Sequence, residues 1–410
     1  MKQLFFILSL LLAQTAFCTT ILVGKTQVIA SLKKGIEAAK DGDTILLQKG
    51  IYKEGNIVIT KSIRLIGIDK PVLDGENKYE ILTVSGSVIL IRGIHFINAG
   101  YSNMNEYAAI NLVDAENVII ENNSIEHCYF AIHVANSRYC LISNNTVTGT
   151  PKTEQTSGNA IHLWKCNNMV IEDNDVQGHR DGIYFEFVTH SFVTGNKSHN
   201  NIRYGLHFMF SNNDSYIDNH FSDNGAGVAV MYSHHVVMLR NTFNHNWGSN
   251  AYGILLKEIS DAQIMKNNFT ENTMAILMES TNRIDIARND FNNNGWAFRI
   301  QASCNENTIA FNNFNGNTFE VATNGTMMLN KFYHNYWDKY EGYDMNKDGF
   351  GDVSYHPVSM YSMVVEQNPN SVILLRSFMV SLLDKAEKAI PSLTPELLID
   401  EQPFMRRIEL

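Results

Sequence analysis

The feature that most constrains the fold of this chain is an internal repeat with a period of about 22 residues. Its first marker is an asparagine followed two positions later by a residue that is apolar in all but one case, Ser198 after Asn196. The spacings between successive members are 22, 29, 22, 23, 22, 26, 22, 23 and 18 residues. The members are Asn123, Asn145, Asn174, Asn196, Asn219, Asn241, Asn267, Asn289, Asn312 and Asn330.

A second marker keeps the same rhythm, with a small residue followed by apolar residues at alternate positions, from Ala131-Ile-His-Val to Ala297-Phe-Arg-Ile. No segment of the repeat has the 3.6-residue period of a helix, the leucine-rich pattern is missing, and a propeller blade needs about 40 residues. The repeat therefore predicts an all-β fold, a right-handed parallel β-helix of the pectin-lyase type. Each repeat forms one coil, and neighbouring coils are about 4.8 Å apart.

The segments outside the repeat predict a division of the chain into five parts. Residues 1–18 carry one lysine and a short apolar run, which is typical of a secretory signal peptide, with a buried N-terminal strand as the alternative. Residues 19–50 form an N-terminal cap with a helix over 31–40, and residues 51–338 form the β-helix. Residues 339–357 are an Asp/Gly-rich loop, and 358–410 a helical partner-docking segment with a helix over 372–390.

Composition excludes several classes of protein. Hydrophobic residues make up 44% of the chain, which is enough for a large core, and the formal net charge is −10. A non-specific nucleic-acid binder needs a basic surface, so we expect no nucleic-acid partner. Four cysteines follow the signal region without any C-x-x-C pair, which argues against a zinc finger. Cys128 and Cys140 could form a bridge, but we expect buried thiols.

The second marker also fixes which side chains point outward. Apolar pairs such as Ile183 and Phe185 point into the core, so their neighbours form two columns on the outer face. The first column is His133, His162, Tyr184, His207, Ala229, Leu255, Leu277 and Arg299. The second is Ala135, Trp164, Glu186, Met209, Met231, Lys257, Glu279 and Gln301.

Outward methionine, histidine and aromatic residues are unusual on a solvated sheet face. Glu186, Met209 and Met231 occupy consecutive coils, and His207 lies on the same coil as Met209. Thioether, imidazole and carboxylate together suit Cu(I), so these four residues are candidate copper ligands. His162, two coils and about 10 Å from His207, is a candidate flanking ligand or entry residue.

Three other interpretations of this outer face stay open. It could be a docking face for a partner, or a face covered by the C-terminal segment. A sugar enzyme would need two carboxyl groups about 5 to 9.5 Å apart, and Glu186 has no acidic neighbour in its column. Asp173, Asp175 and Asp181 lie near turns, where they could still approach one another.

A second candidate site lies in the Asp/Gly-rich loop. Asp344, Asn346, Asp348 and Asp352 place oxygen ligands as in the first half of an EF-hand, with Gly349 at the sharp turn. Tyr355 stands where the closing glutamate belongs, so the loop is either a structural Ca²⁺ site or a turn rich in Asp and Asn without a metal.

Five segments in order carry a resemblance to a known family. They are GNAIHLWKC (158–166), GHRDGIYFEF (178–187), RYGLHFMFSN (203–212), GAGVAVMYS (225–233) and NYWDKYEGYDMNKDGFGD (335–352). With these segments and the tail at 381–403, the chain closely resembles the NosD family of nitrous oxide reductase maturation proteins.

The resemblance implies a periplasmic protein that works with an ABC transporter, meaning a membrane subunit and its ATPase. It also implies a role in assembling the copper–sulfide centre of nitrous oxide reductase, with a copper-donor lipoprotein as a further partner and the C-terminal segment engaging the membrane subunit. We therefore expect a non-enzymatic factor that handles copper, or alternatively sulfur, for the reductase. The main alternative is a scaffold that links transporter and reductase and binds no metal.

Overall fold

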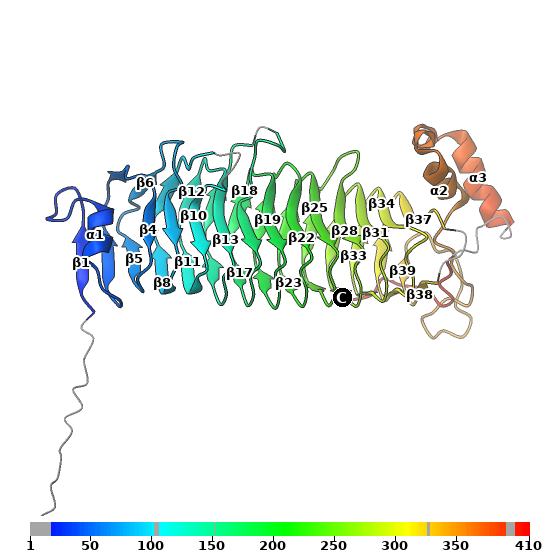
Figure 1. The fold of residues 1–410 in the computed structure, drawn as a ribbon. Coiled ribbons are helices and arrows are strands. Elements are labelled where there is room, and N and C mark those ends of the chain that lie inside the picture. The colour runs from blue at the N-terminus through cyan, green and yellow to red at the C-terminus, as the bar shows by residue number, and fades with distance from the viewer. Residues whose placement is uncertain (1–17, 102–105, 152, 326–328, 391–397) are drawn as a thin grey trace, which may run out of the picture.

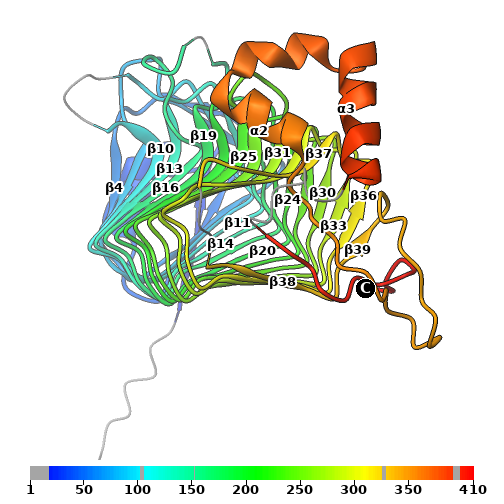
Figure 2. The ribbon, with the colours of Figure 1, turned by 90° about the vertical axis from the view of Figure 1, so that its right-hand side faces the viewer.

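The chain winds into a long solenoid of parallel β-strands, which confirms the predicted right-handed parallel β-helix (Figure 1). The computed structural model describes residues 18–101, 106–151, 153–325, 329–390 and 398–410. The signal peptide predicted at 1–18 lies outside the described residues except for its last position, Cys18. Each coil contributes one strand to each of three sheets, here called A, B and C, which enclose the core (Figure 2).

Within the described residues, sheet A has 14 strands, sheet B has 13 and sheet C has 12, and all neighbours within a sheet pair in parallel. Sheet A consists of β1 (Thr20–Val23), β2 (Thr44–Leu47), β5 (Arg64–Gly67), β8 (Ser87–Arg92), β11 (Glu116–Glu121), β14 (Leu141–Ser143), β17 (Val170–Glu172), β20 (Phe192–Thr194), β23 (Ser215–Ile217), β26 (Val237–Leu239), β29 (Gln263–Met265), β32 (Asp285–Ala287), β35 (Thr308–Ala310) and β38 (Lys331–Tyr333). Sheet B consists of β3 (Ile51–Tyr52), β6 (Val72–Asp74), β9 (His95–Ile97), β12 (Ser124–Glu126), β15 (Thr146–Thr148), β18 (Asp175–Gln177), β21 (Lys197–His199), β24 (His220–Ser222), β27 (Thr242–Asn244), β30 (Asn268–Thr270), β33 (Asp290–Asn292), β36 (Asn313–Asn315) and β39 (Tyr336–Trp337). Sheet C consists of β4 (Ile57–Ile59), β7 (Leu82–Val84), β10 (Ala108–Val113), β13 (Phe130–Ala135), β16 (Ile161–Trp164), β19 (Asp181–Glu186), β22 (Tyr204–Met209), β25 (Ala226–Met231), β28 (Tyr252–Lys257), β31 (Met274–Glu279), β34 (Trp296–Ile300) and β37 (Phe319–Thr323).

The core is filled by the alternate apolar residues of each strand. Ile183, Phe185, Leu206 and Phe208 of sheet C are fully buried, as the second marker predicts. Sheet B adds a column of stacked rings, in which the centroids of Phe243 and Phe269 are 4.7 Å apart. Because strands in successive coils are in register, identical side chains lie above one another and their contacts continue along the solenoid.

The repeating asparagines form a ladder at the corner between sheets A and B. The backbone N–H and the side-chain Nδ2 of Asn219 both donate to Oδ1 of Asn241, each at 3.0 Å. The same pair of bonds links the other members, and each Nδ2 donates as well to a backbone carbonyl of the preceding coil, as Asn219 does to Val193 at 2.8 Å. The buried turn therefore has its polar groups paired, which explains why asparagine recurs there.

One asparagine of the series named in the sequence analysis does not belong to this ladder. Asn312 donates to Asn335, 23 residues later, and not to Asn330. Asn330 belongs to the corner between sheets C and A, where it accepts from Asn307, and its apolar partner Phe332 lies in sheet A. The spacing of 18 residues between Asn312 and Asn330 is shorter than a full coil and reflects this change of corner.

Asp400 of the C-terminal tail ends the ladder. Its carboxylate accepts hydrogen bonds from the backbone N–H groups of His334 and Asn335, from Nδ2 of Asn335 and from Nε1 of Trp337, at 3.0 to 3.1 Å. Asp400 is fully buried, and the sequence analysis did not single it out.

Helices lie at both ends of the solenoid. Helix α1 (Leu32–Ala38) has Ser31 as its N-cap and packs at the first coil, near the predicted position. The helix predicted over 372–390 was too long. Residues Pro369–Leu374 form a 3-10 helix, η1, the backbone turns at Arg376 with φ of 65°, and α3 (Phe378–Ala389) starts after the N-cap Ser377.

In the described part of the C-terminal segment, helix α2 (Met360–Gln367) covers the last coils of sheet C. The helix packs on β37, and Glu366 accepts two hydrogen bonds from Arg299 of β34 at 2.8 and 2.9 Å (Figure 2). The interpretation of sheet C as a face covered by this segment therefore holds for its last strands and not for the strands that carry the copper candidates.

Among the buried polar groups without a hydrogen-bond partner in the described residues, two lie on one coil of the solenoid. They are Oδ2 of Asp214 and the hydroxyl of Tyr216, both on the coil of β23. Burial raises the pKa of Asp214 to about 8, although its Oδ1 accepts the N–H of Ser191 at 2.7 Å. Asp214 therefore stays protonated at neutral pH in the folded chain.

Candidate functional site

The predicted copper ligands lie on the outer face of sheet C, in register across consecutive strands. Glu186 of β19 is the Cα partner of Met209 of β22, and Met209 is the partner of Met231 of β25. All three side chains are partly exposed. The structure thus brings these three residues together, and His207 lies two positions before Met209 on the same strand.

From His133 to Leu255 the first outward column is buried, contrary to the expectation of an exposed sheet. His133, His162, Tyr184 and His207 follow one another along sheet C, and His162 and His207 are only 7% and 6% exposed. Their rings pack edge to face, with centroids 4.6 Å apart for His162 and Tyr184 and 4.9 Å apart for Tyr184 and His207. The rings of this column shield one another from solvent. Strand register alone does not predict this burial.

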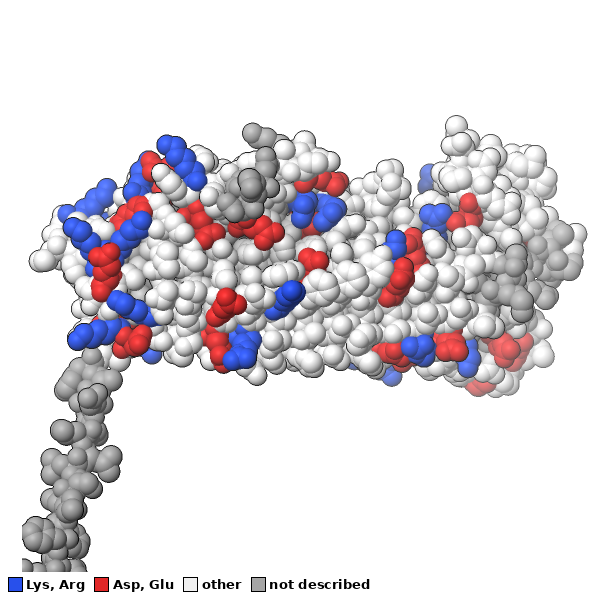
Figure 3. All heavy atoms as spheres, in the orientation of Figure 1, with Lys and Arg blue, Asp and Glu red and all other residues white. Residues whose placement is uncertain are grey.

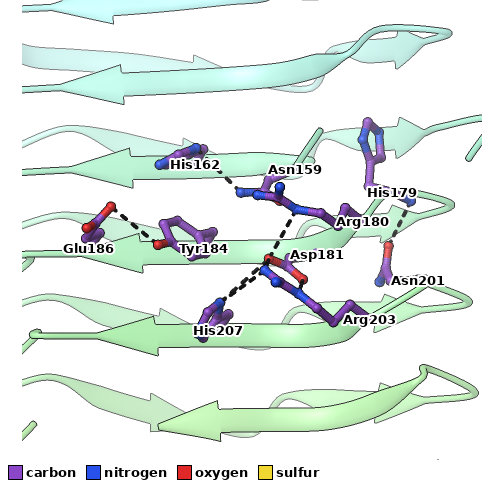
Figure 4. Close-up of polar contacts among 10 residues, drawn as sticks. All are labelled: Asn159, His162, His179, Arg180, Asp181, Tyr184, Glu186, Asn201, Arg203 and His207. Carbon is purple, nitrogen blue, oxygen red and sulfur yellow. Dashed lines mark hydrogen bonds and ion pairs between the residues drawn. The ribbon is translucent and has the colours of Figure 1, made fainter. Parts of the chain in front are cut away.

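His162 lies apart from the other candidate ligands, because the Tyr184 ring stands between it and His207 (Figure 4). Burial, together with the nearby His133, lowers the pKa of His162 to about 3, so the imidazole is neutral at neutral pH. Glu106 contacts the other end of this group, with its Oε2 2.9 Å from Nε2 of His133.

A buried carboxylate that the sequence analysis did not select as a ligand organises the site. Asp181 of β19 is fully buried and accepts hydrogen bonds from Nε and Nη2 of Arg203, the first at 2.8 Å (Figure 4). Burial opposes its ionisation, but the contacts with His207 and Arg203 prevail and lower the pKa of the carboxyl. Asp181 is therefore an ionised, paired group and not a free acid.

One ring nitrogen of His207 has polar neighbours, and the other has none among the described residues. Its Nδ1 lies 3.7 Å from Oδ2 of Asp181 and 3.4 Å from Nη2 of Arg203. Its Nε2 is buried and has no hydrogen-bond partner among the described residues. A buried ring nitrogen without a partner, on an imidazole whose other nitrogen lies near a carboxylate, is a candidate metal ligand.

One of the two methionines, Met231, contacts an apolar cluster on the outer face of sheet C. The cluster contains Ala229, Tyr252, Leu255 and Met274. Ala229 is the strand partner of His207 and is fully buried within this cluster. Thioether sulfur and a neutral imidazole fit Cu(I) and do not suit a hard cation such as Mg²⁺.

The described part of the chain contains no group of three or more His, Cys, Asp or Glu side chains arranged to hold a metal ion. A site on sheet C would therefore depend on sulfur from Met209 and Met231, together with one nitrogen or oxygen. Such a site is open, with few ligands, and it differs from a structural metal centre with four enclosed ligands.

An exposed stack of rings lies beside these residues and was missed by the sequence analysis. Phe187, Phe210 and Tyr232 each follow a member of the Glu186–Met209–Met231 column. The ring centroids are 5.2 Å apart for Phe187 and Phe210, and 4.9 Å apart for Phe210 and Tyr232. Each ring is more than a third exposed, so this ring stack is a candidate protein contact surface.

The predicted calcium ligands all lie in one exposed loop, where they accept hydrogen bonds from the loop itself. Asp344 accepts from the backbone N–H groups of Lys347 and Gly349, at 2.6 and 2.9 Å. Asp352 accepts from the N–H of Met345 at 2.7 Å, and Asn346 donates to Asp348 at 3.0 Å. These bonds hold the loop as an Asx-rich turn, and Ca²⁺ binding stays a prediction.

Charged side chains are sparse on the long face of the solenoid. Figure 3 shows scattered Lys, Arg, Asp and Glu among wide uncharged areas.

Cys128, Cys140, Cys166 and Cys304 are buried free thiols in the structure, as we expected. In the described residues, every helix is too short or too polar to cross a membrane.

The fold and this outer face define a right-handed β-helix protein, and comparisons with known proteins agree. A model of the right-handed β-helix region matches residues 29–157. A surface adhesin of Streptococcus pneumoniae, PfbA, superimposes with a TM-score of 0.51 at 13% identity, over 74% of this chain and 86% of the adhesin. An α-1,3-glucanase from Streptomyces thermodiastaticus gives 0.54 at 13% identity, over 75% and 62% of the two chains, and both likenesses concern the fold alone.

The chain belongs to the NosD family, whose model is described as periplasmic copper-binding protein and matches residues 143–347, half of the chain. A protein of Pseudomonas aeruginosa named probable ABC transporter binding protein NosD is 27% identical over 94% of both chains. A protein of the same name from Stutzerimonas stutzeri is 31% identical over 72 residues, which are 18% of this chain and 16% of that one.

Proposed function

We propose that this protein is a periplasmic maturation factor for nitrous oxide reductase that holds Cu(I) transiently on the outer face of sheet C. Membership of a family described as copper-binding supports this role. The observation that carries it is the juxtaposition of Met209 and Met231 on neighbouring strands, beside a buried His207 whose Nε2 has no partner among the described residues.

The chemistry of the proposed ligand atoms suits transfer of Cu(I) better than its storage. Two thioethers and one imidazole bind Cu(I) in preference to harder ions, and the partial exposure of the methionines leaves the metal open to a second protein. Glu186 accepts a hydrogen bond from the Tyr184 hydroxyl at 3.3 Å, so this carboxylate is positioned by its neighbour and is available at the edge of the site. Cu(I) bound in this way is released when ligands of an acceptor protein replace the ligands of this site.

We assign ATP hydrolysis and membrane attachment to partner proteins. Its only sequence similarity to a nucleotide-binding motif, Gly24-Lys25-Thr26, has a threonine where the first glycine of the motif belongs, so ATP hydrolysis falls to a transporter ATPase. The name of the Pseudomonas relative supports an ABC transporter as partner. We assign the contact with its membrane subunit to the exposed apolar residues of η1 and α3, which are Ile373, Leu374, Leu375, Phe378, Met379 and Leu382.

Anaerobic titration with Cu(I) against a competing chelator tests the copper site. The double variant Met209→Leu/Met231→Leu keeps apolar side chains of similar volume and removes both sulfur atoms. We expect it to bind Cu(I) at least about tenfold more weakly than the parent at this site. Met345→Leu, which replaces an exposed methionine far along the chain, is the matched control. Equal affinity of the double variant and the parent would show that the site is wrong.

The ring stack favours a second candidate function, a scaffold that joins transporter and reductase without binding copper. Pull-down of purified reductase by the parent and by Phe187→Ser/Phe210→Ser measures this contact. If the parent retains the reductase but binds no Cu(I), the scaffold replaces the copper carrier as the function.

A sugar enzyme is a weaker alternative, although the fold occurs in glucanases. Asp181, the buried acid of sheet C, is already paired with Arg203 and is not free to act as a general acid. We expect no turnover of a panel of uronans and α-glucans, and release of reducing ends or unsaturated products would contradict this.

A further inference from the structure

Two adjacent exposed histidines lie at the corner between sheets C and A, outside the candidate site on sheet C. His234 and His235 follow Tyr232 of the ring stack after one buried serine, Ser233. Nδ1 of His234 lies 2.7 Å from Nδ1 of His235, and the two rings meet edge to face with centroids 4.9 Å apart. These two residues are called the histidine pair below.

The corner holds the backbone of the histidine pair in register with its neighbours. His234 forms a parallel bridge with Ser260 of the next coil, and its N–H donates to Oδ1 of Asn212 at 2.9 Å. The N–H of His235 donates to the carbonyl of Ser260 at 3.2 Å. Because the backbone is already ordered, a ligand that binds both rings has to order only the two side chains.

The fold does not require histidine at either position. The same positions of the preceding coil are Asn212 and Asn213. His235 has φ of 54°, in the left-handed region, and Asn213 has the same conformation with φ of 59°. Asparagine is among the residues that adopt this conformation most readily, so it satisfies the turn. The sequence has no other pair of adjacent histidines, and the turn does not explain this one.

The carboxylate beside the pair is already engaged. Asp261 is the counterpart of His235 on the next coil, and its two oxygens accept from Nε and Nη2 of Arg283 at 2.7 and 2.8 Å. The histidine pair therefore offers two nitrogen ligands and no third side chain, in agreement with the lack of larger His, Cys, Asp and Glu groups in the described ranges. Water, or a ligand of another molecule, would fill the remaining positions on a bound ion.

The separation of the two nitrogens suits a single metal ion. Imidazole nitrogens bind Zn²⁺ at about 2.0 to 2.1 Å, so two nitrogens at right angles on one ion lie about 2.9 Å apart. Both side chains of the pair are exposed, so they can open from 2.7 Å to this distance without disturbing the core. The ring that donates its Nδ1 proton to the other ring carries that proton on Nε2 instead when Nδ1 binds a metal.

Two imidazoles select a particular class of ion. Imidazole suits Cu²⁺, Zn²⁺ and Ni²⁺, whereas Mg²⁺ and Ca²⁺ prefer oxygen ligands. Among the divalent ions of the first transition row, affinity for the same nitrogen ligands is highest for Cu²⁺ and lower again for Zn²⁺. The pair therefore differs from Met209 and Met231, whose thioethers suit Cu(I).

We propose that the histidine pair binds one divalent transition-metal ion, Cu²⁺ most tightly, through Nδ1 of His234 and Nδ1 of His235. The open coordination positions allow the ion to exchange with solvent or to accept a ligand from a second protein. This site does not depend on the proposed Cu(I) function of sheet C, because it uses other residues, other ligand atoms and another oxidation state.

His234→Asn/His235→Asn tests the site, because it converts the pair into the residues of the preceding coil and so preserves the turn. His190→Asn is the matched control. His190 is an exposed histidine with φ of 54° at the position of His235 two coils earlier, and it follows a threonine instead of a second histidine. Each full-length protein, prepared without a polyhistidine tag, is titrated calorimetrically with Cu²⁺, Zn²⁺ and Mg²⁺.

We expect the parent and His190→Asn to bind Cu²⁺ more tightly than Zn²⁺ and to bind no Mg²⁺ at this site. The double variant should bind both transition-metal ions at least about tenfold more weakly. Electron paramagnetic resonance of the parent with one equivalent of Cu²⁺ should show hyperfine coupling to two nitrogens, and the double variant should lose this coupling.

Met209→Leu/Met231→Leu should keep the nitrogen coupling to Cu²⁺, so failure of the sheet C site and failure of the histidine pair are distinguished. If the double variant binds Cu²⁺ and Zn²⁺ as tightly as the parent, or gives the same resonance spectrum, the proposal is wrong. The two imidazoles would then be hydrogen-bonded surface side chains and no metal site.

Discussion

Replacing Asp214 with asparagine should stabilise the protein, and by an amount that depends on pH. Asp214 is fully buried, one of its oxygens has no partner among the described residues, and its pKa is raised to about 8 from an ordinary value of 3.8. Between these two values the unfolded chain releases a proton that the folded chain keeps. The free energy of unfolding therefore falls as pH rises from about 4 to about 8.

The size of the effect follows from the shift. At 1.36 kcal/mol for each pKa unit, the penalty at pH 7 is about 4 kcal/mol, and at pH 5 it is about 2 kcal/mol. Asp214→Asn removes the titration and keeps an acceptor for the N–H of Ser191. It also adds an Nδ2 donor, as in Asn307, which occupies the same corner and donates to the carbonyl of Thr281 at 2.8 Å.

Urea unfolding followed by tryptophan fluorescence at pH 5, 6, 7 and 8 measures the difference between variant and parent. We expect the variant's advantage to grow steadily over this range, because other titrating groups cancel in the difference. Asn307→Asp is the converse control, since it introduces a carboxyl at the equivalent position and should lose stability as pH rises. A difference between Asp214→Asn and parent that stays constant from pH 5 to pH 8 would refute the reasoning.

Three further predictions concern the C-terminal end. Asp400→Ala leaves four donors of the last coil without their acceptor and should cost about 3 kcal/mol or more, visible as faster amide exchange over 331–337. Glu320 is buried beside the Tyr355 hydroxyl with its pKa raised to about 7, mainly by burial, so Glu320→Gln should gain about 3 kcal/mol at pH 7.5 and little at pH 5. Equal gains at both pH values would contradict that explanation. Ca²⁺ at millimolar concentration should raise the melting temperature if the Asp344 loop binds it, and Asp344→Asn/Asp348→Asn should abolish the rise; no rise in the parent leaves the loop as a metal-free turn.

Much of the fold could be predicted from the sequence because a solenoid repeats one local rule. The asparagine at each turn and the apolar residues at alternate positions recur once per coil, so register and side-chain direction follow from spacing alone. This is why Glu186, Met209 and Met231 could be assigned to neighbouring strands. Asn330 was misassigned because two corners of the same coil both use asparagine.

The features that could not be predicted depend on contacts that do not repeat from coil to coil. The burial of His162 and His207 comes from rings packed across strands, and spacing fixes only which face a side chain is on. The closure of the ladder by Asp400 joins residues 65 positions apart, from a tail with no repeat.

The asparagine ladder between sheets A and B has a direction. Every side-chain amide donates toward the next coil, from Asn123 through to Asn335, so the small dipoles of these groups add along the solenoid as peptide dipoles add along an α-helix. The positive pole of this column is at the last coil, where the carboxylate of Asp400 meets it. Removing the tail would expose that pole to water, so the final residues of the chain provide the counter-charge for a polarity built up over ten coils.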